Sequence, residues 1–293
     1  MRDLRLYYPM PVFPPVSVTG GRCELLCSHC RGRYLGHMPD VSTPERLRDF
    51  CVRHGEAGGV GVLISGGSTL EGRVPLGPFL STIAWVRENT GLIVNLHTGM
   101  LDAAEAEGIA STGADIVSVD VVGSDDTIRD VYGLRASVEE YGATLTNLVD
   151  AGAPHVAPHI CVGLHYGRVL GEHRAVEIAA GINPEVMVFL GLIPTENTPM
   201  AGVPPPPSGE VAGLISEAKR MSPRTDVSLG CMRSREHKDE LDWAAVEAGA
   251  SRVALASRST EQRALDVGYN VIRLDGCCAV PRSLEGRMLR REG

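Results

Sequence analysis

Three cysteines near the N-terminus, Cys23, Cys27 and Cys30, occur within eight residues in a C-x3-C-x2-C pattern. They follow a short apolar run and the pair Gly20-Gly21, so they are predicted to share one tight loop. Three thiolates on one loop can hold three irons of a [4Fe–4S] cube and leave the fourth iron open to a small chelating ligand. The alternative is half of a zinc site, which would need further ligands elsewhere in the chain. In either case the loop is a candidate metal site.

Small and polar residues follow other short apolar runs, where they could bind a ligand. The stretch Ser65-Gly66-Gly67-Ser68 contains two glycines, which let a ligand approach free backbone N–H and C=O groups. A bare Gly-Gly turn is the alternative. Asp120 lies in an otherwise apolar run, where a carboxylate without a partner would be costly to bury, so we expect it to bind a ligand. His97 is a second candidate, with a hydrogen-bonded core histidine as the alternative.

The later cysteines are candidates for a second metal site. Cys231 follows an apolar run, and Cys277 and Cys278 are adjacent in the C-terminal tail. If the tail folds back over the site, these three thiols could hold a second iron–sulfur cluster, with Cys161 as a fourth ligand. The alternative is that they are small buried hydrophobic residues, the role that we expect for Cys51.

The elements that must position these residues alternate between strand and helix patterns with a period of about 30 residues. Eight short apolar segments are predicted to be parallel strands buried on both faces, at residues 16–19, 61–65, 93–97, 116–121, 156–163, 186–192, 226–230 and 252–256. Between them, Thr43-Pro44-Glu45 opens one of several predicted helices with an N-cap and a proline at the first helical position.

Eight such repeats predict an α/β fold, a TIM-type (β/α)8 barrel, full or slightly open, with function at the C-terminal ends of the strands. A doubly wound sheet is the alternative. We expect the barrel to span residues 1–268. A tail of residues 269–293 is expected to cover the barrel mouth and to contribute Cys277 and Cys278.

The composition is that of a globular protein without a membrane span. Of 293 residues, 43% are hydrophobic and 4% aromatic. There is no apolar run of about 18 residues and no apolar start typical of a signal peptide, which predicts a cytoplasmic protein with no membrane partner. In that reducing compartment the eight cysteines are candidates for metal ligands or free thiols before disulfides. A formal charge of −8 without a basic stripe argues against nucleic acid as a partner.

The cysteine loop resembles the signature of the radical S-adenosylmethionine (SAM) superfamily, in which the open iron binds the amino and carboxylate groups of SAM. The motifs taken together are similar to the biotin synthase-like branch, and within it to a subunit of the archaeal-type two-component lipoyl synthase. This resemblance covers nearly the whole chain and rests on the cysteine loop, Ser65-Gly66-Gly67 and residues 96–99, 120–123, 163–167, 198–200, 229–233 and 277–278.

The resemblance implies roles for particular residues. Those expected to contact SAM are Ser65, Gly66, Gly67, Ser68, His97, Asp120, Gly163, Glu172 and Asn197. Two depart from the family pattern: Ser68 stands where the family usually has Glu, and Asn197 replaces a glycine whose left-handed turn Asn tolerates. The resemblance also implies that Cys161 and Cys231 act in catalysis as ligands of a second, sacrificial cluster.

The reaction that the resemblance implies is sulfur insertion into a C–H bond by a radical SAM sulfurtransferase. An electron from a ferredoxin or flavodoxin would cleave SAM into methionine and a 5′-deoxyadenosyl radical. That radical would take a hydrogen atom from a small substrate, and the carbon radical would attack a sulfide of the auxiliary cluster. The substrate would be a lipoyl-type octanoyl group or a secondary-metabolite precursor such as a nucleotide.

Two other functions stay open on the sequence alone. One is a radical SAM epimerase, mutase or dehydrogenase with a single cluster and no sulfur transfer. The other is a non-catalytic metal-binding protein. A second radical SAM subunit is a further partner that the resemblance leaves open, and neither the substrate nor the oligomeric state can be read from the sequence.

Overall fold

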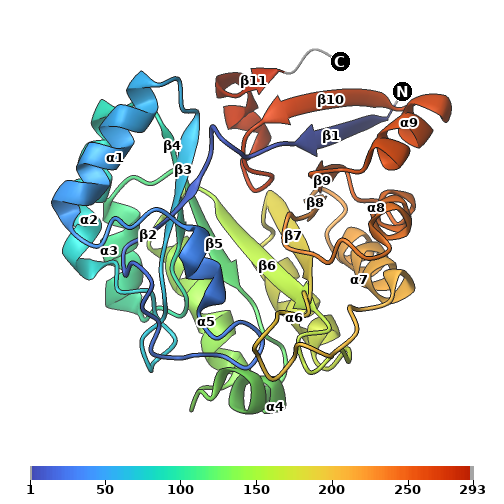
Figure 1. The fold of residues 1–293 in the computed structure, drawn as a ribbon, viewed down its shortest axis with the longest axis horizontal. Coiled ribbons are helices and arrows are strands. Elements are labelled where there is room, and N and C mark those ends of the chain that lie inside the picture. The colour runs from blue at the N-terminus through green and yellow to red at the C-terminus, as the bar shows by residue number, and fades with distance from the viewer. Residues whose placement is uncertain (1, 291–293) are drawn as a thin grey trace.

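One sheet of 11 strands, curled into an open barrel, organises the protein (Figure 1). The structure is a computed structural model that describes residues 2–290. The strands lie in the order β11-β10-β1-β9-β8-β7-β6-β5-β4-β3-β2. Described neighbours are parallel except β10 and β11. Because β2 and β11 stand at the two edges, the barrel does not close. The predicted TIM-type α/β fold is confirmed, in its open form.

All eight predicted strands are present, as β2 (Pro15–Ser17), β3 (Gly61–Ser65), β4 (Ile93–His97), β5 (Ile116–Asp120), β6 (Val156–Val162), β7 (Val186–Gly191), β8 (Asp226–Leu229) and β9 (Arg252–Ala254). The helices are α1 (Pro44–Glu56), α2 (Leu80–Asn89), α3 (Ala103–Ser111), α4 (Asp125–Thr127), α5 (Val138–Asp150), α6 (Glu172–Gly181), α7 (Ser208–Met221), α8 (Lys238–Glu247) and α9 (Arg258–Asp266). Short helical turns are η1 (Arg33–His37), η2 (Gly77–Phe79), η3 (Ile128–Tyr132) and η4 (Arg282–Arg287). Helix α1 starts as predicted, because the Thr43 side chain accepts a hydrogen bond from the Arg46 N–H. No helix among residues 2–290 has the length and apolar character needed to cross a bilayer.

The strands are apolar because both of their faces are buried. Outward side chains such as Val94 and Val117 pack under the helices in one large core. Inward side chains such as Ile93 and Ile116 form a second core, which also contains Val280 from the C-terminal tail. Burial on two sides explains why these strands lack the alternating polar pattern of a half-exposed sheet.

Three further strands, β1, β10 and β11, are not predicted by the sequence. β11 (Leu289–Arg290) pairs with β10 at one edge of the sheet. β1 (Asp3–Tyr7) lies between β9 and β10 (Asn270–Asp275) and is parallel to both. β10 is only partly buried, so its residues form no apolar run that would reveal a strand. Because β10 belongs to the barrel sheet, the expected division at residue 268 falls inside that sheet. Residues 1 and 291–293 of the expected barrel and tail lie outside the described residues.

The C-terminal tail lies at the opposite end of the barrel from the one expected. After β10, Arg282 and Arg287 reach residues that precede strands: Arg282 bonds Glu185 and Asp226, and Arg287 bonds Asp115 and the Gly91 carbonyl. These contacts hold the tail across the N-terminal ends of the strands. In Figure 1 the red tail and the dark blue loop of residues 23–37 lie at opposite ends of the sheet. The expectation of a tail over the barrel mouth is therefore wrong.

A buried group of charges fixes this arrangement. The Asp226 carboxylate, at the start of β8, accepts hydrogen bonds from Arg252 (2.8 Å) and Arg282 (2.6 Å). Arg252 is 0% exposed and also pairs with Glu285 of the tail (3.3 Å), which accepts a hydrogen bond from Tyr7 Oη (2.7 Å). A sequence cannot show these pairings, because the partners are up to 278 residues apart.

Replacing Asp226 with Ala should destabilise the protein, because it leaves Arg252 buried without its main counter-charge. We expect the free energy of unfolding, measured by urea denaturation of the metal-free protein at neutral pH, to fall by about 3–5 kcal/mol. Asp150 is exposed at the end of α5 and has no ion pair among the described residues. Its replacement with Ala should change the free energy by less than about 0.5 kcal/mol, and equal losses for the two variants would contradict the prediction.

The same comparison has a defined pH dependence. Burial would raise the pKa of Asp226, but hydrogen bonds and charges from Arg282 and Arg252 hold it below the ordinary 3.8. A carboxyl whose pKa is lower in the folded state stabilises the fold at neutral pH and loses that contribution as the pH falls. The difference between wild type and Asp226→Ala should therefore shrink below about pH 4.

Candidate active site

The loop with Cys23, Cys27 and Cys30 lies at the C-terminal ends of the strands, where parallel barrels carry their active sites. Its backbone is tied to the segments that follow β3 and β5. The Glu24 N–H donates to the Ser68 carbonyl (2.9 Å), and the Ser28 N–H donates to the Val131 carbonyl (2.8 Å). The loop is therefore held by the barrel and not only by its own turns.

The cysteine loop brings potential metal ligands together. The side-chain donor atoms of Cys27, His29 and Cys30 all lie within 4.8 Å of one another. Cys23 Sγ lies nearby on the same loop, 3.9 Å from the Ser68 carbonyl oxygen. In the described part of the chain no other group of three His, Cys, Asp or Glu side chains comes together in this way. The second ligand pair that a zinc site would need is therefore absent from the described residues around the loop.

The electrostatics of the loop suit metal-bound thiolates. The hydrogen bond from Cys27, aided by His29, lowers the pKa of the Cys30 thiol to about 4 despite its burial. The same hydrogen bond and burial raise the pKa of Cys27. His29 Nδ1 is buried and has no hydrogen-bond partner among the described residues. Because thiolate is the form that binds iron, this donor set fits the predicted cluster.

Gly67 allows the loop to pack against the end of β3. A Cβ atom at residue 67 would overlap the Arg22 carbonyl oxygen and would lie 2.6 Å from Cys23 Cα and 2.7 Å from Cys23 Cβ. The sequence analysis expected the backbone N–H and C=O groups of this turn to be free to bind a ligand, but two of them are not. The Gly67 N–H donates to Thr19 Oγ1 (2.7 Å), and the Ser65 carbonyl accepts from the Val18 N–H (2.8 Å). These two backbone groups are engaged within the protein.

His97 and Asp120, at the ends of β4 and β5, form a pair inside the barrel. His97 Nε2 lies 3.4 Å from Asp120 Oδ1, and the side chains remain 29% and 43% exposed. Burial disfavours the charged form of both side chains, but the attraction between the two charges has the larger net effect. The pKa of Asp120 is therefore lowered to about 2, and the pKa of His97 is raised. His159 of β6 lies 5.8 Å from His97, ring to ring, and burial together with His97 lowers its pKa to about 4. The site thus holds an anionic carboxylate between one imidazole that gains a proton readily and one that stays neutral.

The sequence analysis assigned no role to three polar residues on the same inner face. Ser118 Oγ donates to Asn95 Oδ1 (2.9 Å), one level below the His97–Asp120 pair, and His159 lies beside that pair. All three occur two residues from a predicted site residue on the same strand, so they point to the same face. The sequence could therefore have indicated these three residues, because each lies two positions before a predicted site residue on the same strand.

A family model for the radical SAM superfamily matches residues 17–180, more than half of the chain, including the cysteine loop. The chain belongs to the radical SAM superfamily. Membership implies a [4Fe–4S] cluster and SAM as cofactors, and the loop with Cys23, Cys27 and Cys30 has the donor set that such a cluster needs. The zinc interpretation of the loop is thereby set aside.

Comparisons with individual proteins indicate the biotin synthase-like branch of this superfamily. The biotin synthase of Synechococcus sp. (strain RCC307) is 26% identical over 235 residues, which are 75% of this chain and 69% of that protein. The crystal structure of HydG, a maturase of the [FeFe]-hydrogenase, matches with a TM-score of 0.64 at 14% identity, over 92% of this chain and 64% of HydG. Methylornithine synthase (PylB) matches with a TM-score of 0.59 at 16% identity, over 92% of this chain and 83% of PylB. The two solved structures show the shared fold, and the sequence match indicates a biotin synthase-like radical SAM protein.

The loops after β6 and β7 contain the other residues expected to contact SAM. Glu172 accepts hydrogen bonds from the N–H groups of Gly163 (2.8 Å) and Leu170 (2.6 Å), so both carboxylate oxygens shape the loop after β6. A contact between this carboxylate and the cofactor stays a prediction. Asn197 has a φ of 59°, which agrees with the expected left-handed turn in place of glycine.

The tail cysteines enter this radical SAM barrel from its N-terminal end. Cys277 and Cys278 belong to the inner core, and Cys277 Sγ lies 3.9 Å from Asn95 Nδ2. Cys231 follows β8, and desolvation together with the Cys278 thiol raises its pKa to about 11. The Cys231 thiol is one of the groups that act to raise the pKa of Cys277. Of the cysteines expected at a second site, Cys277 and Cys278 therefore lie at the inner core of the barrel, whereas Cys231 is exposed just after β8.

Cys161, the fourth of these cysteines, interacts with the other end of the barrel interior. Burial, Asp120 and Glu172 raise its pKa. It lies on β6 and packs against the same small core as Leu25 of the cysteine loop and Tyr132. Its role as a ligand of a second cluster stays a prediction.

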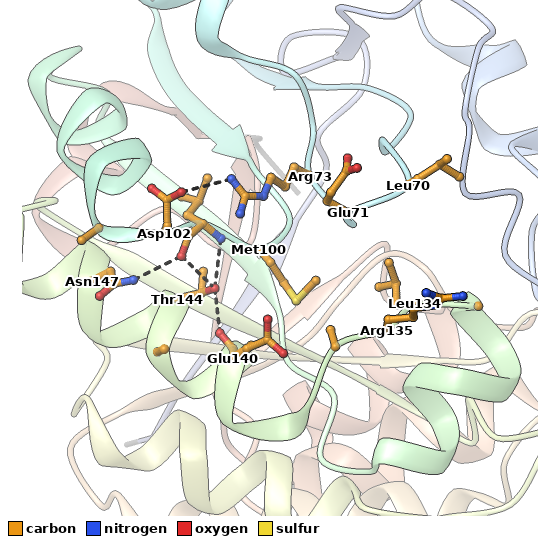
Figure 2. Close-up of a pocket in the computed structure, with 15 residues that line it drawn as sticks. Leu70, Glu71, Arg73, Met100, Asp102, Leu134, Arg135, Glu140, Thr144 and Asn147 are labelled. Carbon is orange, nitrogen blue, oxygen red and sulfur yellow. Dashed lines mark hydrogen bonds and ion pairs between the residues drawn. The ribbon is translucent and has the colours of Figure 1, made fainter.

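A cavity lies on the outside of this end of the barrel. It has a volume of about 710 Å³ and is lined by residues of α5 and of the loops after β3, β4 and η3. In Figure 2 Met100 points into it between the Arg73–Asp102 pair and Leu134. None of the cysteines and neither His97 nor Asp120 lines this cavity, so it is separate from the radical SAM site.

Replacing Gly67 with Ala should prevent the cysteine loop from binding its cluster, because the added Cβ would overlap backbone atoms of Arg22 and Cys23. After anaerobic reconstitution we expect iron and sulfide each to fall by about four per chain. Gly21→Ala is a matched control in the same loop, since a Cβ there meets nothing within 4 Å. Full iron content in Gly67→Ala would show that the loop can move without losing the cluster.

Replacing Asp120 with Asn should lower the pKa of His97. Asp120 raises that pKa above 6.5 against the effect of burial, so burial alone would then act on the imidazole. The ring protons of His97 can be titrated by NMR in the metal-free protein. Asp130→Asn, which removes an exposed carboxylate paired with Arg129, should leave the titration unchanged. An unchanged His97 pKa in Asp120→Asn would rule out the pair.

Proposed function

We propose that this radical SAM enzyme inserts sulfur from an auxiliary iron–sulfur cluster into a small substrate. The observation that carries the proposal is the entry of two tail cysteines into the barrel: Cys278 lies in the inner core, and Cys277 Sγ lies 3.9 Å from Asn95 Nδ2 of β4. The cysteine loop faces the other end of the same interior. A substrate between the two groups of thiols would meet a radical on one side and a source of sulfur on the other. The similarity to proteins named biotin synthase supports this interpretation.

At the cysteine loop, Cys23, Cys27 and Cys30 would hold the [4Fe–4S] cluster. When bound, the cluster and SAM supply a 5′-deoxyadenosyl radical that takes a hydrogen atom from the substrate. The chain contributes binding, orientation and the exclusion of water. Because the pKa of Asp120 is about 2, its carboxylate is ionised at neutral pH and can accept hydrogen bonds from ribose hydroxyls, while His97 holds it in place.

The remaining contacts to SAM would come from the strand ends. The turn Ser65-Gly66-Gly67-Ser68 would lie beside the methionine part of SAM, through the backbone groups that the protein itself does not use. Gly163, whose loop is shaped by Glu172, would face the adenosine, and the turn at Asn197 would flank the adenine.

The auxiliary cluster would be held by Cys231, Cys277 and Cys278, with Cys161 as a further ligand. Cys231 and Cys161 would then be catalytic residues, because the sulfur that enters the substrate is bound beside them. Between the two cysteine groups, Asn95, Ser118 and His159 offer hydrogen-bonding groups. That polar lining favours a secondary-metabolite precursor such as a nucleotide over a bare octanoyl chain as the substrate.

The second candidate function is a radical SAM epimerase, mutase or dehydrogenase with one cluster only. Cys278 is packed in the inner core with Val280 and Leu274, and its pKa is raised well above the ordinary value. A thiol that is buried and neutral can serve as a small hydrophobic residue. This observation favours a structural role for the tail cysteines in the second candidate.

The electron donor would be a ferredoxin or flavodoxin that docks on the cysteine loop. Arg22, Arg31 and Arg33 are exposed on this loop, and the described residues offer none of them an ion pair. Positive charge beside the cluster on a chain with a net charge of −8 would attract a small acidic electron carrier. A second radical SAM subunit is a further proposed partner.

Counting iron tests the proposal. We expect about eight irons per chain in the anaerobically reconstituted wild type, and about four fewer after Cys231→Ala, with SAM cleavage retained. Cys51→Ala removes a thiol that is fully buried in α1, away from both groups, and should leave the iron content unchanged. About four irons in the wild type would favour the second candidate. If Cys231→Ala kept all eight irons, the proposed ligand set would be wrong.

A further inference from the structure

The turn that carries Cys277 and Cys278 is held tightly at both of its ends. At its start the Gly276 N–H donates to the Tyr8 carbonyl (3.1 Å), and a Cβ at residue 276 would lie 2.5 Å from Met288 Sδ. At its end the Val280 N–H donates to the Cys277 carbonyl (3.2 Å). The turn therefore folds back on itself under the later part of the tail, with both thiols in the inner core.

A single barrel side chain, Arg252 of β9, binds the backbone of this turn. Its Nη1 donates to the carbonyls of Val280 (2.6 Å) and Cys278 (3.4 Å). Its Nε and Nη2 donate to Asp226 Oδ2, at 3.1 and 2.8 Å, and Nη2 also pairs with Glu285. The guanidinium thus donates through Nη1 to the backbone of the turn and through Nε and Nη2 to carboxylates of the barrel and the tail.

The same turn places its thiols at the inner core of the barrel. Cys278 packs in that core with Leu274 and Val280, and Cys277 Sγ lies 3.9 Å from Asn95 Nδ2 of β4. Arg252 therefore holds the backbone of a turn whose two thiols lie inside the barrel.

We infer that Arg252 is a positioning residue that fixes the tail turn so that Cys277 and Cys278 can act together as ligands of the proposed auxiliary cluster. This inference rests on the proposed auxiliary cluster. Lys cannot replace Arg252 in this role, because one ammonium group can neutralise Asp226 but cannot reach both carbonyls in the same geometry. The assembly of the second cluster then depends on a side chain that does not ligate it.

Two substitutions of Arg252 test the inference. Arg252→Lys keeps a positive charge beside Asp226, and Arg252→Met keeps length without charge. In both variants we expect the reconstituted protein to lose the auxiliary cluster, about four irons per chain and its signal in electron paramagnetic resonance, while the irons of the first cluster remain. Arg273→Met is the matched control: Arg273 lies on β10 and pairs with Glu261 outside the barrel, so its iron content should match the wild type.

A second measurement does not depend on iron. In the metal-free protein, alkylation of Cys277 and Cys278, mapped by mass spectrometry, should be roughly tenfold faster in Arg252→Lys than in the wild type, because two hydrogen bonds to the turn are lost. Cys51 reports global unfolding and should stay protected in both proteins.

The outcomes separate the inference from the proposed function. Eight irons in the wild type and in Arg252→Lys, with unchanged alkylation, would overturn the inference and leave the proposed function intact. Four irons in the wild type would overturn both. Equal loss of both clusters, or exposure of Cys51, would assign Arg252 a general structural role and also overturn the inference. If Arg252→Met fails to fold, the result for Arg252→Lys decides.

Discussion

The charge pairing between Asp226 and the arginines around it determines how the barrel ends. The interior of an open barrel would be exposed at the N-terminal ends of its strands. A segment that covers this end must pair with the backbone groups and charged side chains at these strand ends. Asp226 pairs with Arg252 of the barrel and with Arg282 of the tail. The tail side chains Val280 and Leu284 then pack in the interior of the barrel. Because Asp226 and Arg252 are both buried, removing one of them would leave the other as an unsolvated charge. The same pairing therefore fixes the tail and the two cysteines that it carries.

The inner face of the sheet changes character along the strands, from apolar to polar. Ile93 and Ile116 lie near the tail, Asn95 and Ser118 lie one step further on, and His97 and Asp120 end the strands. A parallel strand brings every second residue to this face, so the polarity rises in steps of two residues. The polar end meets the cysteine loop, where the radical SAM family binds its cofactors. An interior that is polar at one end suits a reactive intermediate, since its side chains can orient that intermediate.

Much of the barrel could be predicted from the sequence, and the reasons are local. The eight apolar runs became strands because both of their faces are buried, and α1 begins at Thr43-Pro44 because capping depends on neighbouring residues alone. The left-handed turn at Asn197 was predictable for the same reason. β1 and β10 could not be predicted in the same way. They pair with each other across some 260 residues, and β10 has no apolar run, so neither shows its place in the sheet. The position of the tail was mispredicted because it depends on ion pairs between residues far apart in the chain.

The sequence by itself determined the chemistry at the N-terminal loop. Three thiols in C-x3-C-x2-C spacing lie close together in a loop or on one face of a helix, because they fall within eight residues, and that spacing indicated the family. The tertiary structure alone decided which other residues join that chemistry. It brought His159 to the His97–Asp120 pair, made the Glu172 carboxylate a hydrogen-bond acceptor within its own loop, and placed Cys277 and Cys278 at the inner core of the barrel. Spacing is a property of neighbours along the chain, whereas these contacts depend on the curl of the sheet and on buried charges that meet only when the chain has folded.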